Sequence, residues 1–338
     1  MAEGRARTAA PTLEMVAREA GVSRATVSRV VNGSPKVSPD VAASVNEAID
    51  RLHYVPNRAA RSLASRTTGA IALVVPEDTT RFFGDPYFAA VVKGITRRLD
   101  SSEYLLNLLV ASSDPGHKTA GYLRSGIVDG ALVISHHSGD DLLNEVANVL
   151  PLVFGGRPSN PSDDAYYVDV DNVAGGDHGT QHIIDLGRRR IGSISGPQDM
   201  PAGIDRLTGF RRAIERCGLP VDAIEMGDFT AASGAEATRR LLDRVPDLDG
   251  LFVASDLMAT GAFVALRERG LSVPGDVAVV GFDDSPAALS DIPLTTVSQP
   301  SEEMGYAMAD TLVRLLEGDR SPAHRNIMPT RLIIRDSA

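Results

Sequence analysis

The sequence lacks several features that would define common classes of protein. It has no tryptophan and only one cysteine, Cys217, among 338 residues, so an intramolecular disulfide framework is excluded. No run of eighteen apolar residues occurs, and the first residues contain no apolar segment typical of a secretory signal. We therefore expect a cytoplasmic protein without a membrane partner.

Familiar catalytic and cofactor motifs are also missing. No two glycines are separated by one residue, which excludes G-x-G-x-x-G, and there is no Walker G-K-[ST], H-E-x-x-H or G-x-S-x-G. His178 and His182 are spaced for one helix face, but no third metal ligand stands nearby, and Cys217 has no evident histidine partner. We expect no enzyme, no cofactor and no metal, although an enzyme on the same fold must be weighed because fold does not fix function.

Charge is unevenly distributed along the chain. The net charge is −10, yet residues 1–66 carry ten basic and six acidic side chains, which gives +4 there and leaves −14 for the remainder. A small basic module joined to a large acidic body is typical of a protein that meets a polyanion at one end only.

Three short amphipathic helices are predicted in the first 52 residues. Thr12, Ser23 and Ser38 stand at N-cap positions, and Gly21 supplies a sharp turn between the first two helices. Each helix has a narrow apolar stripe, so the three bury these stripes against one another: Leu13, Val16, Ala17 and Ala20; Val27, Val30 and Val31; Val41, Val45, Ala48, Ile49 and Leu52.

The second helix has an unusual polar face. Two helices joined by a glycine turn form a helix-turn-helix, whose second helix enters the major groove of DNA. Arg24 and Arg29 suit guanine edges, Ser28 and Asn32 suit bases or phosphates, and Ala25 suits a thymine methyl group. A merely solvated helix face is the alternative, but the turn, the caps and the local positive charge together favour DNA.

The segment "PNRAARSLAS", residues 56–65, has the pattern of a very short helix. Asn57 can cap it, and Ala60 and Leu63 share one face. Two turns are too few for a stable isolated helix, so we expect this segment to fold only on binding. A plain linker with an incidental leucine is the alternative.

Beyond residue 66 the pattern changes to short apolar strands separated by helices. This alternation predicts an α/β, doubly wound architecture with parallel sheets, long enough for two lobes. The predicted strands are 70–75, 104–110, 130–135, 150–155, 190–195, 250–255 and 277–282, with a further one at "IEMG".

Ligands of such folds bind beyond the carboxyl ends of the strands. Carboxylates, arginines and aromatic rings follow the predicted strands, a set that suits a polyhydroxylated ligand. An aspartate there is also a common helix cap, as for Asp283 beside Asp284, and Phe88 has the spacing of a core residue. The candidate effector-binding residues are Asp85, Tyr87, Phe88, Arg157, Arg206, Phe229, Asp256 and Asp283.

The sequence resembles the lactose-repressor/galactose-repressor family of bacterial regulators. Residues 12–65 carry its "VAxxAGVSxxTVSRVVN" core and "YxPNxxAxxLA" tail, and "DPYFAAVVKGI", "DRLTGFRRAI" and "VPGDVAVVGFDD" resemble its periplasmic-binding-protein-like sensor domain. The resemblance implies that 57–65 is a hinge helix whose Leu63 wedges into the minor groove. It implies DNA contacts by Thr12, Arg24, Ala25, Thr26, Ser28, Arg29, Asn32, Asn57, Ala60 and Leu63.

The resemblance also implies a mechanism and an organisation. We expect a repressor that binds a pseudo-palindromic double-stranded operator as a homodimer and is released by a sugar or oligosaccharide, with a cellobiose-like glucoside as a first guess. The family's tetramerising leucine tail is not matched by "PTRLIIRDSA". A purine-like corepressor stays open, whereas a pure solute-binding protein is disfavoured by the DNA module. We expect a DNA-binding module at 1–66 and an effector domain at 67–338, with lobes at 67–165 plus 295–324 and 166–294 plus 325–338.

Overall fold

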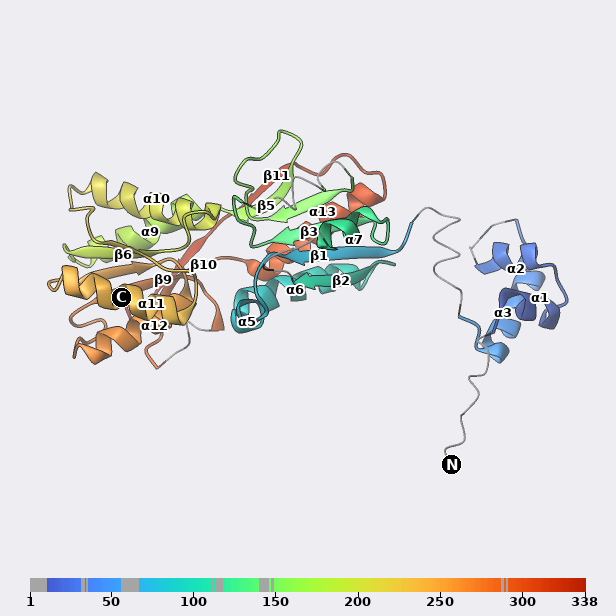
Figure 1. Ribbon diagram of the computed structural model, residues 1–338, viewed down its shortest axis with the longest axis horizontal. Coiled ribbons are helices and arrows are strands. Elements are labelled where there is room, and N and C mark those ends of the chain that lie inside the picture. The colour runs from blue at the N-terminus through green and yellow to red at the C-terminus, as the bar shows by residue number, and fades with distance from the viewer. Residues whose placement is uncertain are drawn as a thin grey trace, which may run out of the picture. The chain divides into compact units, whose positions relative to one another are not determined.

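The computed structural model divides the chain into two compact units, residues 1–68 and 69–338 (Figure 1). The expected boundary, after residue 66, lies two residues earlier. The residues described are 11–31, 34, 36–55, 67–110, 112, 118–139, 146, 149–286, 289 and 291–338. Within these ranges, no helix is both long enough and apolar enough to cross a membrane.

The described part of the first unit contains three short helices that begin as their sequence predicts. The Thr12 hydroxyl accepts a hydrogen bond from the Met15 amide, and the Ser23 hydroxyl accepts one from the Thr26 amide. Ser38 occupies the third N-cap, but its side chain makes no capping hydrogen bond. Gly21 has φ +65°, a left-handed conformation that glycine adopts without strain. The helices are α1 (Leu13–Glu19), α2 (Arg24–Val31) and α3 (Pro39–Leu52).

A very small core holds these helices together. Its fully or nearly fully buried members come from all three helices and from the second residue after α3, so no helix buries its stripe alone. They are Val16, Ala17, Val27, Val45, Ala48 and Tyr54.

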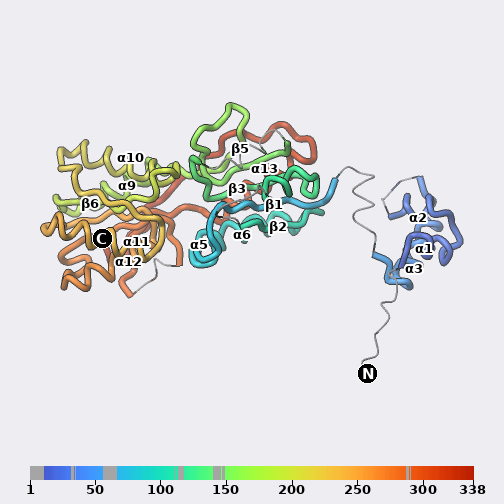
Figure 2. Tube along the Cα trace, viewed as in Figure 1, coloured from blue at the N-terminus to red at the C-terminus, as the bar shows by residue number. Residues whose placement is uncertain are grey.

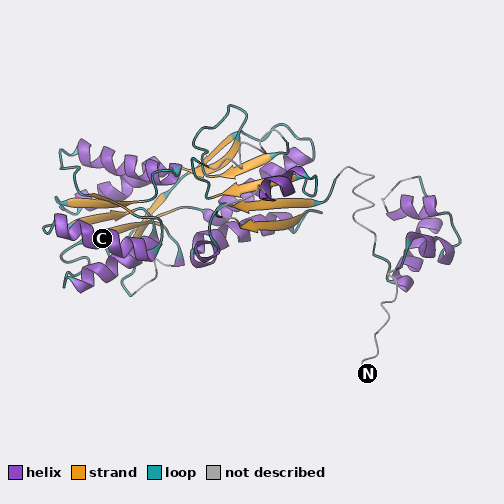
Figure 3. Ribbon diagram, viewed as in Figure 1, coloured by secondary structure: helices purple, strands orange, loops and turns teal. Residues whose placement is uncertain are grey.

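The second unit contains two six-stranded sheets, each the centre of a lobe with helices against its faces (Figure 3). The first sheet has the order β11-β5-β4-β3-β1-β2 and is parallel throughout. Helix α13 packs against α6 and against this sheet. The elements of the first lobe are β1 (Ala70–Val75), α5 (Thr79–Gly84), α6 (Pro86–Leu99), β2 (Leu105–Val110), α7 (Lys118–Arg124), β3 (Gly130–Ile134), β4 (Leu152–Gly155), β5 (Tyr166–Val170), α13 (Ser301–Leu316) and β11 (Arg325–Met328).

The second sheet repeats the plan of the first, with the order β12-β10-β9-β8-β6-β7. It is parallel except for β12, which runs antiparallel to β10. Helices α9 and α10 pack together as one pair, and α11 and α12 as another. The elements are α9 (Asn172–Asp185), β6 (Ile191–Ser195), α10 (Pro201–Arg216), β7 (Ile224–Met226), α11 (Ala231–Arg244), β8 (Gly250–Val253), α12 (Asp256–Glu268), β9 (Ala278–Asp283), β10 (Thr295–Ser298) and β12 (Arg331–Ile333).

The chain crosses between the lobes three times, and the crossings differ from the expected lobe boundaries (Figure 2). They fall after β5, between β10 and α13, and between β11 and β12. Strand β5 therefore belongs to the first lobe although the expected boundary preceded it, and β10 belongs to the second lobe. The strands beside the crossings, "YYVDV", "TTVS", "RNIM" and "RLI", contain polar residues and lack the uniform apolar run that identified the other strands.

Candidate functional site

A cavity lies between the two lobes, at the carboxyl ends of their strands. It occupies about 680 Å³, including the open space at its mouth. Seven of the eight candidate effector-binding residues line it, so residues from 85 to 283 meet at one place. The lining also includes Arg81, Ser135, His136, Gly155, Gly156, Asp169, Asn172, Met200, Pro201, Ala202, Ser255, Gln299 and Met304.

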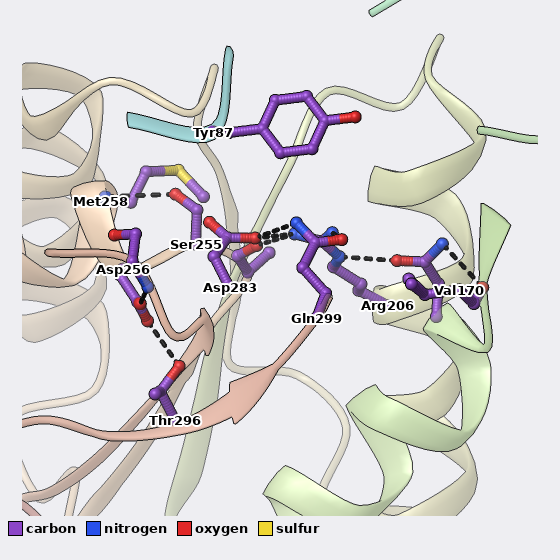
Figure 4. Close-up of polar contacts among 12 residues, drawn as sticks. Tyr87, Val170, Arg206, Ser255, Asp256, Met258, Asp283, Thr296 and Gln299 are labelled. Atoms are coloured by element: carbon purple, nitrogen blue, oxygen red, sulfur yellow. Dashed lines mark hydrogen bonds and ion pairs between the residues drawn. The ribbon is translucent and has the colours of Figure 1, made fainter. Parts of the chain in front are cut away.

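Arg206 organises the floor of the cavity (Figure 4). Its Nε donates to Asn172 Oδ1 at 2.9 Å, and Nη1 donates to the Ala254 carbonyl at 2.7 Å and to Asp283 Oδ1 at 3.3 Å. The Gln299 amide nitrogen donates to the same Asp283 oxygen at 2.7 Å. These bonds fix the guanidinium and satisfy the charge of Asp283 within the protein.

Aromatic rings complete the surroundings of Arg206. Its guanidinium lies 3.6 Å from the centre of the Phe282 ring and 5.8 Å from that of Phe229. Arg81 approaches Phe229 at 5.4 Å, so two arginines flank one ring. A Cβ at Gly196 would lie 2.2 Å from Phe229, so only glycine leaves room for this ring. Phe229 thus presents an aromatic surface held by cation–π contacts.

Burial changes the ionisation of the acidic and phenolic groups in the cavity. Burial raises the pKa of Asp283, and the Arg206 charge opposes this rise. Burial also raises the pKa of Asp85 and of the Tyr87 hydroxyl. A phenol with a raised pKa stays protonated at neutral pH, so Tyr87 presents a hydroxyl that can both donate and accept a hydrogen bond.

Asp85 and Tyr87 of the first lobe each keep a polar group available to a ligand. Asp85 caps α6 through Oδ1, which accepts from the Tyr87 amide at 3.0 Å, as the capping alternative predicted. Within the described ranges, neither the second oxygen of Asp85 nor the Tyr87 hydroxyl has a hydrogen-bond partner. The Tyr87 ring lies above the group formed by Arg206, Asp283 and Gln299 (Figure 4). The second lobe therefore offers a preformed charge network, and the first offers unused hydroxyl and carboxylate groups.

Backbone strain is concentrated at the cavity. Ser135, Phe229 and Asp283, which all line it, have φ values of +58°, +68° and +119°. Non-glycine residues rarely adopt positive φ, and such residues often occur at ligand-binding sites. Strain at three lining residues is independent support for a functional cavity.

Phe88 and Arg157 line the cavity but also take part in the protein's own packing and ion pairing. Phe88 is 1% exposed and packs in the core of the first lobe, as the core alternative predicted, and it also contributes to the cavity lining. The Arg157 guanidinium donates to both oxygens of Asp205 at 2.9 Å. Arg157 is therefore committed to a protein carboxylate.

Asp256 requires a correction because it does not line the cavity. It is fully buried at the start of α12, where its carboxylate accepts hydrogen bonds from the Thr296 hydroxyl at 2.5 Å and the Ser285 amide at 2.8 Å. Burial raises its pKa. Its neighbour Ser255 lines the cavity and caps α12 by accepting from the Met258 amide. Asp256 thus supports the turn that follows Asp283 and is not part of the cavity lining.

The sequence did not predict several of the lining residues. Three of these lie in or just after strands β5 and β10, which the sequence also did not predict. Asp169 lies in β5, Asn172 begins the helix after it, and Gln299 follows β10. Had these strands been recognised, the rule that ligands bind beyond carboxyl ends would have found all three. His136 was missed although it follows β3. Its Nε2 lies 3.1 Å from the Arg157 carbonyl, and burial lowers its pKa to about 4.

The helical unit presents the predicted DNA-binding face on α2. Arg24, Ala25 and Arg29 are exposed, and Thr26 and Ser28 are half-buried. Arg24 forms an exposed ion pair with Glu14 at 3.1 Å. Thr12, also exposed, uses its hydroxyl to cap α1. Asn32, Asn57, Ala60 and Leu63 lie outside the described residues, as does the expected hinge at 57–65.

The described residues contain no group of three or more His, Cys, Asp or Glu arranged to hold a metal ion. His178 and His182 both lie on α9.

Comparisons with known proteins match both units. Residues 12–57 match the family described as bacterial regulatory proteins, lacI family, and residues 180–338 match the periplasmic binding protein-like domain. Two of the similar solved structures are the CelR-cellobiose complex, with TM-score 0.78 and 44% identity, and the lac repressor dimer bound to operator and the anti-inducer ONPF, with TM-score 0.84 and 28% identity. They cover 97% of this chain each, and 100% and 98% of their own chains.

Similar curated proteins extend over nearly the whole chain. The HTH-type transcriptional regulator CelR of Thermobifida fusca is 46% identical over 97% of this chain and 98% of its own length. The ribose operon repressor of Escherichia coli is 33% identical over 97% of this chain and 99% of its own. The predicted α/β class and family resemblance are therefore confirmed, and the chain belongs to the LacI family of bacterial DNA-binding transcriptional regulators.

Proposed function

We propose that this regulator is a repressor whose helical unit binds operator DNA and whose cavity binds a neutral oligosaccharide that releases it. The ligand class is inferred from which polar groups of the cavity are already paired within the protein and which are not. Arg206 and Asp283 neutralise each other, while the Tyr87 hydroxyl and the second Asp85 oxygen remain available. A sugar supplies hydroxyl donors for these acceptors and an apolar C–H face for Phe229.

Cellobiose is the first compound to test. A CelR structure similar to this chain is a complex with cellobiose, and the CelR sequence is similar along nearly its whole length. A charged sugar is disfavoured because two carboxylates of the lining, Asp85 and Asp169, form no ion pair within the described residues and would repel a phosphate or a sugar acid.

The DNA-binding proposal assigns base readout to α2. Arg24, Ala25 and Arg29 are its exposed members, and Thr26 and Ser28 lie beside them. Arg24 must leave Glu14 to reach a base, but an exposed ion pair contributes at most about 1 kcal/mol, so the exchange for a guanine contact is favourable. The assigned hinge contacts of Asn57, Ala60 and Leu63 remain predictions.

A homodimer follows from the need to place two such units on a pseudo-palindromic operator. The edge strand β2 supports it, because Leu105 and Leu108 are 52% and 44% exposed there. An open edge with exposed leucines is normally covered by a partner. Sedimentation equilibrium of the full chain tests this assignment.

The central experiment measures operator binding with and without sugar. A thermal-shift screen of cellobiose, other neutral disaccharides and cellobionic acid identifies the ligand, since a compound bound only to the folded state raises the Tm. Fluorescence anisotropy with an operator selected from random duplexes then measures release. We expect cellobiose to weaken operator binding about 5- to 150-fold. Tighter operator binding with the sugar would replace the inducer by a corepressor, and no effect of any sugar in the screen would refute the effector assignment.

A further inference from the structure

Two ion pairs join the lobes beside the cavity. In the first, His137 of the first lobe lies with Nδ1 2.8 Å from Asp199 Oδ2 of the second. The backbone closes the same contact, because the Ser138 amide donates to the Asp199 carbonyl at 2.9 Å. The loop after β3 is therefore attached to the segment that leads into α10.

The second ion pair involves Asp205, a second-lobe residue six positions after Asp199. Arg157, which follows β4 of the first lobe, donates to both oxygens of Asp205 at 2.9 Å. Asp205 precedes Arg206 directly in α10. Its side chain is 20% exposed and that of Arg157 is 33% exposed, so this pair, in which Arg157 Nη2 donates to both carboxylate oxygens, is partly shielded from water.

His137 is held in place and charged by its own lobe. Glu77, whose side chain is 8% exposed, accepts from the Ser135 hydroxyl at 2.6 Å and pairs with Arg81 at 2.8 Å and with His137 Nε2 at 3.3 Å. The hydrogen bond to Glu77, with a further one to Asp199, raises the pKa of His137 to about 9, against the opposing effect of burial. His137 therefore carries a positive charge at neutral pH and links a carboxylate of each lobe.

Both pairs sit next to residues that enclose the cavity. Ser135 and His136 precede His137, and Met200, Pro201 and Ala202 lie between Asp199 and Asp205; all five line the cavity. Neither Asp199 nor Asp205 lines it. A separation of the lobes that opened the cavity here would have to break both pairs.

We propose that the His137–Asp199 and Arg157–Asp205 pairs form an interlobe latch, which holds the cavity closed and thereby sets how tightly and how slowly ligand exchanges. This inference rests on the proposed function, because the cavity must be the effector site for its exchange to matter. Asp199 and Asp205 are positioning residues in this scheme. They restrain the segment 199–206 and with it Arg206, without contacting ligand.

Asp199→Asn with Asp205→Asn removes both negative charges of the latch and keeps the size of the side chains. Asp222→Asn and Asp177→Asn form the matched control, because these residues make bidentate pairs with Arg190 and Arg216 inside the second lobe. The first measurement is amide hydrogen exchange of the ligand-free full chain. We expect the latch variant to exchange about tenfold faster than wild type across 133–139 and 199–206, with no such change in the control. Equal exchange in the latch variant and wild type would overturn the latch.

The second measurement is cellobiose dissociation, followed by calorimetry and by stopped-flow release. We expect the latch variant to release cellobiose about tenfold faster and to bind it correspondingly more weakly, while the control matches wild type. The reversed pair Arg157→Asp with Asp205→Arg should recover slower release than Arg157→Asp alone. Equal release by those two variants would contradict the latch. Failure of wild type to bind cellobiose would refute the choice of effector, and the exchange experiment would still decide whether the latch exists.

Discussion

The helical unit and the two-lobed unit use their charged side chains in opposite ways. On α2, Arg24 and Arg29 are exposed, and the described helices are held together by a core of buried residues that carry no charge. In the cavity, Arg206 is 5% exposed and bound on several sides by the protein itself. Charge is therefore available to an external polyanion in the first unit and is part of the internal structure in the second. Substitutions should separate binding from stability in the first unit and join them in the second.

The largest effect is expected from Arg206→Ala. Removing the guanidinium leaves Asn172, the Ala254 carbonyl and Asp283 without their partner in a buried place, which should cost about 3–5 kcal/mol in the free energy of unfolding. Sugar binding should be lost as well. Urea unfolding measures the first effect and calorimetry the second. Arg190→Ala, at an exposed pair of the same lobe, is the control and should change stability by about 1 kcal/mol or less. If Arg206→Ala were as stable as wild type, Arg206 would not be part of the internal structure of the two-lobed unit.

Arg29→Ala should show the reverse pattern. Its exposed side chain contributes little to folding, so the free energy of unfolding should change by about 0.5 kcal/mol or less. Operator affinity should fall by about 1–3 kcal/mol, with relaxed preference at one base pair. Anisotropy titrations on operator variants measure both. Arg51→Ala on α3, which pairs with Glu19, serves as a control that should leave base preference intact. Unchanged operator specificity in Arg29→Ala would remove this residue from base readout.

Tyr87→Phe should affect binding alone, although it lies in the second unit. The hydroxyl has no hydrogen-bond partner in the described part of the chain, so its removal should leave the Tm unchanged. Sugar affinity should fall by about 0.5–1.5 kcal/mol, the contribution of one hydrogen bond. Tyr306→Phe, at a partly exposed tyrosine beside Arg97, is the matched control. Equal sugar affinity in wild type and Tyr87→Phe would show that the ligand does not use this hydroxyl.

The smallest effect concerns pH and His137. Its pKa in the folded chain is raised to about 9 from an ordinary value near 6.5, so its stabilising contribution is complete below about pH 6.5 and is lost as pH rises through 9. Solvent reaches this pair, since Asp199 is 54% exposed, and the loss should therefore be only about 0.5 kcal/mol. Urea unfolding at pH 6, 7.5 and 9 should show a steeper decline for wild type than for His137→Gln. Parallel declines would indicate that the interlobe pair contributes nothing.

Local sequence patterns predicted the three helices of the first unit, most of the strands and several residues of the cavity. The three helix stripes, the caps at Thr12 and Ser23, and the turn at Gly21 predicted the helical unit, because each depends on residues within one or two turns. Uniform apolar runs predicted most strands, and β1 lies at the predicted residues, 70–75. Residues at strand ends, such as Tyr87, Arg206 and Asp283, could be chosen as cavity candidates because parallel strands place their carboxyl ends together.

Only the tertiary structure decided which lobe some strands belong to and which distant side chains bond to each other. Strands β5 and β10 are positioned by the strands beside them and by the crossings between the lobes. Their sequences contain polar residues and give no local strand signal, so the cavity residues that follow them, Asn172 and Gln299, were not predicted. Asp256 and Asp283 both lie at the carboxyl end of a strand. The Asp256 carboxylate nevertheless bonds to the Thr296 hydroxyl and the Ser285 amide outside the cavity, whereas the Asp283 carboxylate bonds to Arg206 within it. The pairing of Asp199 with His137, 62 residues earlier, is likewise invisible in sequence. Hydrogen bonds between distant residues depend on how the lobes pack, and no local pattern encodes that arrangement.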